Sequence, residues 1–219
     1  HPDFNASIPK QRIEQAKQAG QVLAENLKTT YPLIPKIEML DHNPMQLILN
    51  RTWHPALAVT GIDGLPHTLN AGNVLLPKLK VRLSLRIPPT LNAEDASHAL
   101  KTLLEKDPPF NAQVEFKISH PASGWDAPLL ANWLETACDK ASTNYFGKPC
   151  IYMGEGGSIP FISYLAEQYP NAQFLITGVL GPHSNAHGPN EFLHIPYTKK
   201  LSAVIGEIIY ATLGKGSSS

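Results

Sequence analysis

The chain has 219 residues, of which 42% are hydrophobic, and its 18 Lys and Arg residues balance its 18 Asp and Glu residues. This composition is ordinary for a globular protein, and the balance excludes the one-signed field typical of nucleic-acid-binding and membrane-surface proteins. No apolar run is long enough to span a bilayer, and the two cysteines, Cys138 and Cys150, lack C-x-x-C spacing. We expect two reduced thiols in a cytoplasmic protein, with a disulfide between them as the alternative.

The two ends of the sequence favour a piece of a longer chain. It begins with His-Pro-Asp instead of an initiator methionine, and it ends in Gly-Lys-Gly-Ser-Ser-Ser, which is a flexible composition. We therefore expect a fragment.

Two helices are expected near the start of the chain. Apolar residues recur at helical spacing between residues 8 and 27, which predicts a helix of about five turns. Two prolines within residues 30–35 break that pattern. Asn43 as N-cap and Pro44 at the first helical position then predict a short helix over residues 43–50.

The middle of the chain has the pattern of an antiparallel sheet covered by a helix. Residues 56–62 favour a strand that ends in an Asp-Gly turn signal, and residues 78–86 alternate between apolar and charged side chains. Asn92 predicts the start of a helix that runs to about residue 106, and residues 113–118 alternate again. These elements predict a ferredoxin-like, two-layer α+β unit.

A different pattern follows a linker or hinge at residues 121–125. Helices are expected at 128–146, 158–169 and 198–213, and short apolar strands at 150–153 and 173–179. Apolar strands that alternate with helices indicate parallel pairing in an α/β layer. We therefore expect two domains, one over residues 1–120 and one over residues 121–219.

A glycine-rich stretch and a histidine in a loop are the first candidates for chemistry. The sequence Gly-Glu-Gly-Gly-Ser at 154–158 precedes a predicted helix, so its backbone N–H groups can receive an anionic oxygen, although Ser158 can equally be a simple N-cap. His187 leaves an apolar strand and is a candidate metal ligand; the alternatives are a solvent-exposed or capping histidine, or His183 as the ligand. Asn185, Asn190 and Glu191 are candidates to fix the tautomer of the ring.

The predicted strand at 78–86 adds two polar candidates. Arg86 lies on its polar face, where a guanidinium can bind a carboxylate through two hydrogen bonds or can simply be solvated. Asn73, which precedes the strand, can donate to a developing oxyanion or can be an ordinary turn residue. One imidazole cannot hold a catalytic zinc, which needs about three protein ligands and a water, so a metal site requires groups from elsewhere.

Taken together, these motifs resemble the carnosinase/aminoacylase-type family of zinc metallopeptidases, which includes cytosolic dipeptidases and succinyl-diaminopimelate desuccinylase. The resemblance covers nearly the whole chain but only the C-terminal part of the family's architecture. The motifs that carry it are Asn-Val-Leu-Leu-Pro at 73–77, Leu-Ser-Leu-Arg at 83–86, Gly-Glu-Gly-Gly-Ser-Ile-Pro at 154–160 and Ala-His-Gly-Pro-Asn-Glu at 186–191.

The resemblance implies a lid domain that often dimerises, followed by the end of a catalytic α/β domain. In that reading His187 is a ligand of one of two zinc ions, Arg86 holds the C-terminal carboxylate of the substrate, and Asn73 polarises the scissile carbonyl. Family lids often reach into the site of a partner subunit, so Arg86 and Asn73 would act there.

The same resemblance implies that Gly157 and Ser158 contact the substrate, with Glu155 as a further candidate beside them. The family's other metal ligands and its general-base glutamate have no counterpart in this sequence. We therefore expect a fragment of an enzyme that hydrolyses dipeptides or N-acyl amino acids, with the fragment itself inactive. The alternative is a non-catalytic binding or dimerisation module.

Overall fold

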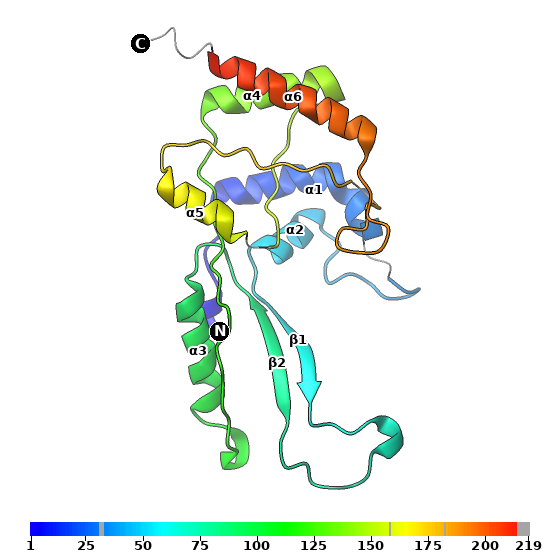
Figure 1. Cartoon of the computed structure of the whole chain (residues 1–219), viewed down its shortest axis with the longest axis vertical. Coiled ribbons are helices and arrows are strands. Elements are labelled where there is room, and N and C mark those ends of the chain that lie inside the picture. The colour runs from blue at the N-terminus through cyan, green and yellow to red at the C-terminus, as the bar shows by residue number, and fades with distance from the viewer. Residues whose placement is uncertain (31–32, 158, 182, 214–219) are drawn as a thin grey trace. The chain divides into compact units, whose positions relative to one another are not determined.

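The computed structural model describes residues 1–30, 33–157, 159–181 and 183–213, and within them the chain forms two compact units (Figure 1). The first unit comprises residues 1–8 and 49–125 and the described part of 155–163, and the second comprises the other described residues. The helices are α1 (Lys10–Thr30), α2 (Pro44–Thr52), α3 (Ala93–Glu105), α4 (Asn132–Phe146), α5 (Pro160–Gln168) and α6 (Ile195–Leu213). The strands are β1 (Ala56–Asp63) and β2 (Lys80–Arg86), and three short 3-10 helices are η1 (Pro2–Phe4), η2 (Thr68–Asn70) and η3 (Pro109–Asn111).

The helices confirm the sequence pattern, and their starts depend on local capping. Asn43 accepts a hydrogen bond from the backbone N–H of Met45 at 3.0 Å, and Asn92 accepts from those of Glu94 and Asp95 at 2.8 and 3.1 Å. These side chains satisfy N–H groups that have no partner inside a helix. The helix expected from residue 128 begins only at residue 132, and the one expected from residue 158 begins at residue 160.

The first unit is built on the antiparallel pair β1–β2. Ala56 lies opposite Arg86 and Asp63 opposite Lys80, with a bulge between Val59 and Gly61. The buried face of α3 packs on this unit, because Ala96 and Leu100 form a small core with Phe4. The half-buried hydrophobic side chains that pack against this core are Leu85, Ile87, Ala99, Leu104 and Phe116. The fold of this unit is therefore a helix on an antiparallel sheet.

Residues 113–118, expected to be a third strand, do not form one. The segment instead binds α3: the backbone N–H of Phe116 donates to Glu105 at 2.6 Å, and Lys101 donates to the Phe116 carbonyl at 3.2 Å. The alternation still has a physical basis, because Phe116 packs against the small core while Val114 is exposed. Its backbone bonds, however, go to side chains and not to a neighbouring strand.

The second unit has its core between α4 and α6, which lie side by side (Figure 1). Its buried members are Leu134, Cys138, Ala141, Val204 and Ile208. Asn144 of α4 also donates to both carboxylate oxygens of Glu207 of α6, at 3.0 and 3.2 Å. Two helices thus bury their apolar stripes against each other.

An ion pair within the second unit connects α1 to the residues that follow the expected linker. Arg12 is bound to Asp126 through Nη2 at 2.7 Å and through Nε at 2.9 Å, and it also donates to the carbonyl of Ala127. These contacts fix residues 126 and 127 against α1.

The prediction of apolar strands at residues 150–153 and 173–179 is wrong, because neither segment forms a strand in the structure. In the described part of the chain, the only ladder joins β1 and β2. A strand exists through hydrogen bonds to a neighbour, so an apolar run of strand-like composition does not form one where no ladder is available. The mixed α and β architecture is nevertheless confirmed by the helices and the antiparallel pair.

The division at residue 120 into a lid and a catalytic part stays a prediction. It concerns function, whereas the two compact units describe which residues pack together.

Candidate functional site

His187 lies in a loop with an unusual backbone. Four residues other than glycine have left-handed φ angles within residues 183–190: His183 at 66°, Asn185 at 55°, His187 at 62° and Asn190 at 59°. Asparagine and histidine enter this region more often than most residues other than glycine, and such outliers gather at functional sites.

Hydrogen bonds inside the loop hold this backbone in place. Glu191 accepts from the backbone N–H of His187 at 3.0 Å, Asn185 donates its amide to the carbonyl of Pro189 at 2.7 Å, and buried Ser184 accepts from the N–H of Gly181 at 2.8 Å. The His187 side chain is exposed. Glu191 and Asn185 therefore bind the backbone of the loop, which is a different role from the tautomer control expected of them.

Glu155 and Gly156 contact a residue that the sequence analysis missed. Arg51, in the last turn of α2, forms an ion pair with Glu155, whose Oε1 also accepts from the backbone N–H of Gly156 at 3.0 Å. A basic residue at a helix C-terminus is ordinarily explained by the helix dipole, so no local signal connects residue 51 to residue 155. Gly157 lies next in the loop, and Ser158 lies outside the described residues.

Arg86 and Asn73 belong to the same unit but lie toward different ends of β2. Arg86 is exposed as the last residue of β2, whereas Asn73 is exposed in the long connection that leads from β1 to the first residue of β2. Figure 1 shows this connection between the two strands. A strand of seven residues spans roughly 20 Å, so β2 separates the two segments. The predicted contacts of Arg86 and Asn73 with one substrate would therefore come from different parts of the unit.

Among the described residues, no three His, Cys, Asp or Glu side chains gather closely enough to hold a metal ion. A catalytic zinc needs about three protein ligands. The described part of this chain therefore does not form a complete metal site, and His187 fits at most the role of one ligand.

Cys138 and Cys150 are both free thiols in the second unit, as expected from the sequence. Burial raises the pKa of both thiols, and it also raises the pKa of the neighbouring Tyr152 hydroxyl. All three groups are therefore protonated at neutral pH, which makes the thiols poor nucleophiles.

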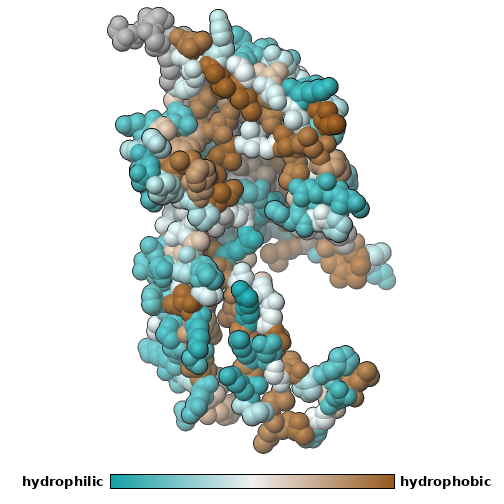
Figure 2. Space-filling view, viewed as in Figure 1, coloured by the Kyte–Doolittle hydropathy of each residue, from teal (hydrophilic) through white to brown (hydrophobic). Residues whose placement is uncertain are grey.

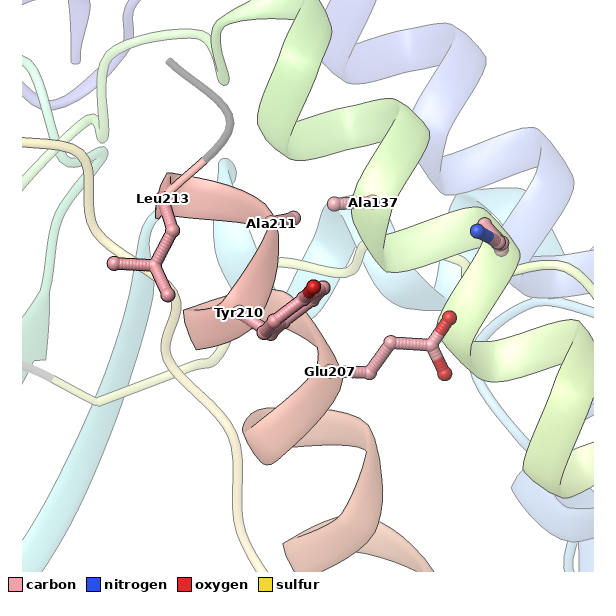
Figure 3. Close-up of a pocket in the computed structure, with 6 residues that line it drawn as sticks. Ala137, Glu207, Tyr210, Ala211 and Leu213 are labelled. Carbon is pink, nitrogen blue, oxygen red and sulfur yellow. The ribbon is translucent and has the colours of Figure 1, made fainter. Parts of the chain in front are cut away.

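A pocket of about 600 Å³ opens between α4 and α6 (Figure 3). Ala137 and Lys140 of α4 and Glu207, Tyr210, Ala211 and Leu213 of α6 line it. None of the site residues expected from the sequence is among them, so this pocket is separate from the candidate site.

Comparison with known proteins gives a sequence relative and several structural neighbours, although no family model matches the chain. A cysteinylglycine-S-conjugate dipeptidase of Corynebacterium striatum is 27% identical over 162 residues, which cover 69% of this chain and 32% of that protein. The chain thus spans about a third of the length of this relative.

Three solved structures share the fold over 94% of this chain. Human carnosine dipeptidase 1 has a TM-score of 0.62 at 15% identity, with 44% of its chain covered. The M20 family metallo-carboxypeptidase Sso-CP2 of Sulfolobus solfataricus has a TM-score of 0.65 at 17% identity, with 46% of its chain covered. The di-peptidase Dug1p of Saccharomyces cerevisiae has a TM-score of 0.64 at 20% identity, with 43% of its chain covered.

These matches confirm the resemblance inferred from the motifs. The chain has the fold of part of an M20-type metallopeptidase, and its sequence is similar to that of a dipeptidase. The described chain also contains no helix long and apolar enough to cross a membrane.

Proposed function

We propose that this chain is the C-terminal part of a metal-dependent peptidase that hydrolyses dipeptides or N-acyl amino acids. The observation that carries the proposal is the 27% identity to a dipeptidase over 69% of the chain. The four motifs that carry the family resemblance, and the fold shared with dipeptidase structures, support it.

In this proposal the first unit binds the substrate. Arg86 is exposed at the end of β2, where its guanidinium can donate two hydrogen bonds to a substrate carboxylate. Asn73 polarises the scissile carbonyl, and Gly157 contributes its backbone, with Ser158 and Glu155 beside it. Because Glu155 is already paired with Arg51, it is the weakest of these candidates.

In the second unit, His187 would supply one ligand to a zinc ion. Zinc, when bound, would provide the Lewis acid that peptide hydrolysis needs. No complete ligand set is found among the described residues, which supports the proposal that the remaining ligands and the general base come from residues outside this sequence. The 219-residue chain alone is therefore proposed to be inactive.

We further propose a homodimer formed through the lid, in the cytoplasm. Every residue of β1 is exposed, including Leu57, Val59 and Ile62, and in the described chain the outer edge of β1 has no neighbouring strand. Such an edge is able to pair with a second copy. The two free cysteines support a reducing compartment.

The test compares the 219-residue chain with the longer protein that contains it, measuring dipeptide hydrolysis and bound zinc. We expect activity and stoichiometric zinc in the longer protein and neither in the chain alone. His187→Ala in the longer protein should lower activity by at least about 100-fold, because even the loss of a residue that supports a metal ligand costs 10- to 100-fold.

His183→Ala is the matched control, since His183 lies in the same loop and also has a left-handed backbone. We expect it to keep activity and zinc. A longer protein that is active without His187 but inactive without His183 would move the ligand to His183. A longer protein with no hydrolytic activity and no zinc would favour the non-catalytic module.

A further inference from the structure

Arg51 lies on a firmly anchored helix end. Its neighbours Leu49 and Trp53 are buried, and the backbone N–H of Trp53 donates to the Leu49 carbonyl at 2.8 Å. Because α2 ends between these buried side chains, the backbone of Arg51 has little freedom to move. It is a fixed point against which a loop can be placed.

The glycine loop, residues 155–157, is bound to this point by a shared oxygen. Glu155 Oε1 accepts from Arg51 Nη2, and the same atom accepts from the backbone N–H of Gly156 at 3.0 Å. One carboxylate oxygen thus connects the guanidinium to the backbone of the loop. The contact joins residues that are 104 positions apart in the sequence.

A second, steric observation points the same way. A Cβ atom at Gly156 would lie 2.8 Å from Arg51 Cγ and 2.8 Å from the Arg51 carbonyl oxygen. The carbonyl belongs to the anchored helix and cannot move aside as the end of a side chain can. The loop therefore packs directly on Arg51, and only glycine permits this approach.

The ion pair itself contributes little to folding. The side chains of Arg51 and Glu155 are 40% and 64% exposed, and pairs this exposed are weak because water screens them. A planar guanidinium does, however, fix the direction of the groups that it binds. The consequence of the pair is thus the geometry of the loop and not the stability of the fold.

We propose that Arg51 is a positioning residue, which holds residues 155–157 in the arrangement in which this loop meets the substrate. The inference rests on the proposed function, because that function supplies the substrate that the loop would meet. The contact between Arg51 and the loop is observed independently of that function. Arg51 acts through Glu155 and Gly156, and it is not proposed to contact the substrate.

The first experiment measures hydrogen exchange of the Gly156 and Gly157 amides in the 219-residue chain by NMR. Arg51→Ala should speed this exchange by up to about five-fold, the factor that a weak surface pair can supply. Arg51→Glu should also speed it, since it places two like charges together. Arg51→Lys, which keeps a cation beside the Glu155 carboxylate, should keep exchange slower than in Arg51→Ala. Lys80→Ala, which removes an exposed ion pair to Asp63 in the same unit, is the control and should leave the loop unchanged.

Unchanged exchange in Arg51→Ala, or exchange in Arg51→Lys as fast as in Arg51→Ala, would overturn the proposal. The second experiment uses the longer, active protein, in which Arg51→Ala should raise KM for a dipeptide and leave kcat nearly unchanged, with partial rescue by Arg51→Lys. A fall in kcat with unchanged KM would also overturn it. A longer protein without peptidase activity would remove the proposed function, while the exchange result would still decide the role of Arg51.

Discussion

Gly20, in the middle of α1, lies directly against the first turn of α2. A Cβ atom there would lie 2.8 Å from the backbone nitrogen of Met45 and 3.0 Å from the carbonyl carbon of Pro44. In an exposed helix, replacing glycine with alanine is stabilising, because glycine loses more backbone entropy on folding. At residue 20 the backbone clash opposes that gain.

We therefore predict that Gly20→Ala destabilises the protein by about 1–3 kcal/mol, the usual cost of overpacking. Gly206→Ala in α6 is the matched control, since nothing lies within 4 Å of a Cβ at that position, and it should stabilise by about 0.5–1 kcal/mol. Urea unfolding of both variants measures the difference. Equal stabilisation by the two substitutions would contradict the close approach of α1 and α2.

Single residues also determine the backbone conformation of the loop around His187, which has several left-handed φ angles. Glu191 holds the backbone N–H of His187, so the loop is closed by a charge-assisted hydrogen bond. The sequence indicated the residues of this loop as candidates to fix the tautomer of the His187 ring, but it did not reveal that Glu191 accepts from the His187 backbone, because spacing alone does not distinguish a ring nitrogen from a backbone nitrogen.

At the scale of elements, α3 holds residues 113–118 through Glu105. Its carboxylate binds Lys101 and accepts from the N–H of Phe116, and these contacts, led by Lys101, lower the pKa of Glu105 below its ordinary value of 4.5. Because the folded pKa is lowered, the stabilisation is fully present above pH 4.5. It is lost as the pH falls through the lowered folded value.

We predict that the Phe116 amide proton shift, followed by NMR, titrates with a midpoint below pH 4.5. Glu105→Gln keeps an acceptor but removes the charge, so that titration should disappear while α3 stays folded. A Phe116 shift that does not change with pH in the unmodified protein would show that the carboxylate does not hold this segment.

At the scale of the whole molecule, large hydrophobic side chains are exposed in many parts of the described chain (Figure 2). Single exposed apolar side chains are ordinary, and only contiguous patches indicate association with other chains. On β1, exposed Leu57, Val59 and Ile62 coincide with an edge that has no neighbouring strand in the described chain, which is the combination that favours pairing with a second copy.

We predict that the 219-residue chain sediments as a dimer and that Leu57→Lys weakens the dimer at least about ten-fold, because a buried, unpaired charge costs more than 1.4 kcal/mol. Leu103→Lys on α3 is the control: Leu103 is 53% exposed, close to the 58% of Leu57, but it does not lie on the strand edge. Equal dissociation constants for the two variants would contradict the edge contact.

The approximate positions of the helices, the caps of α2 and α3, and the motifs are all readable from the sequence. Asn43 and Asn92 bind N–H groups within three residues of themselves, so these starts depend only on local chemistry. Apolar spacing likewise marks the faces of α4 and α6 that form the core. The order of the motifs was enough to indicate the peptidase resemblance, which the comparisons confirm.

The pairing of segments and the contacts between distant side chains, in contrast, depend on the folded chain. Residues 113–118, 150–153 and 173–179 have the composition of strands, yet ladder formation depends on a neighbour that composition does not specify. The contact of Arg51 with Glu155 and Gly156 depends on how the chain returns after about 100 residues. Local sequence encodes the propensity of each segment, but such long-range contacts exist only once the backbone has folded.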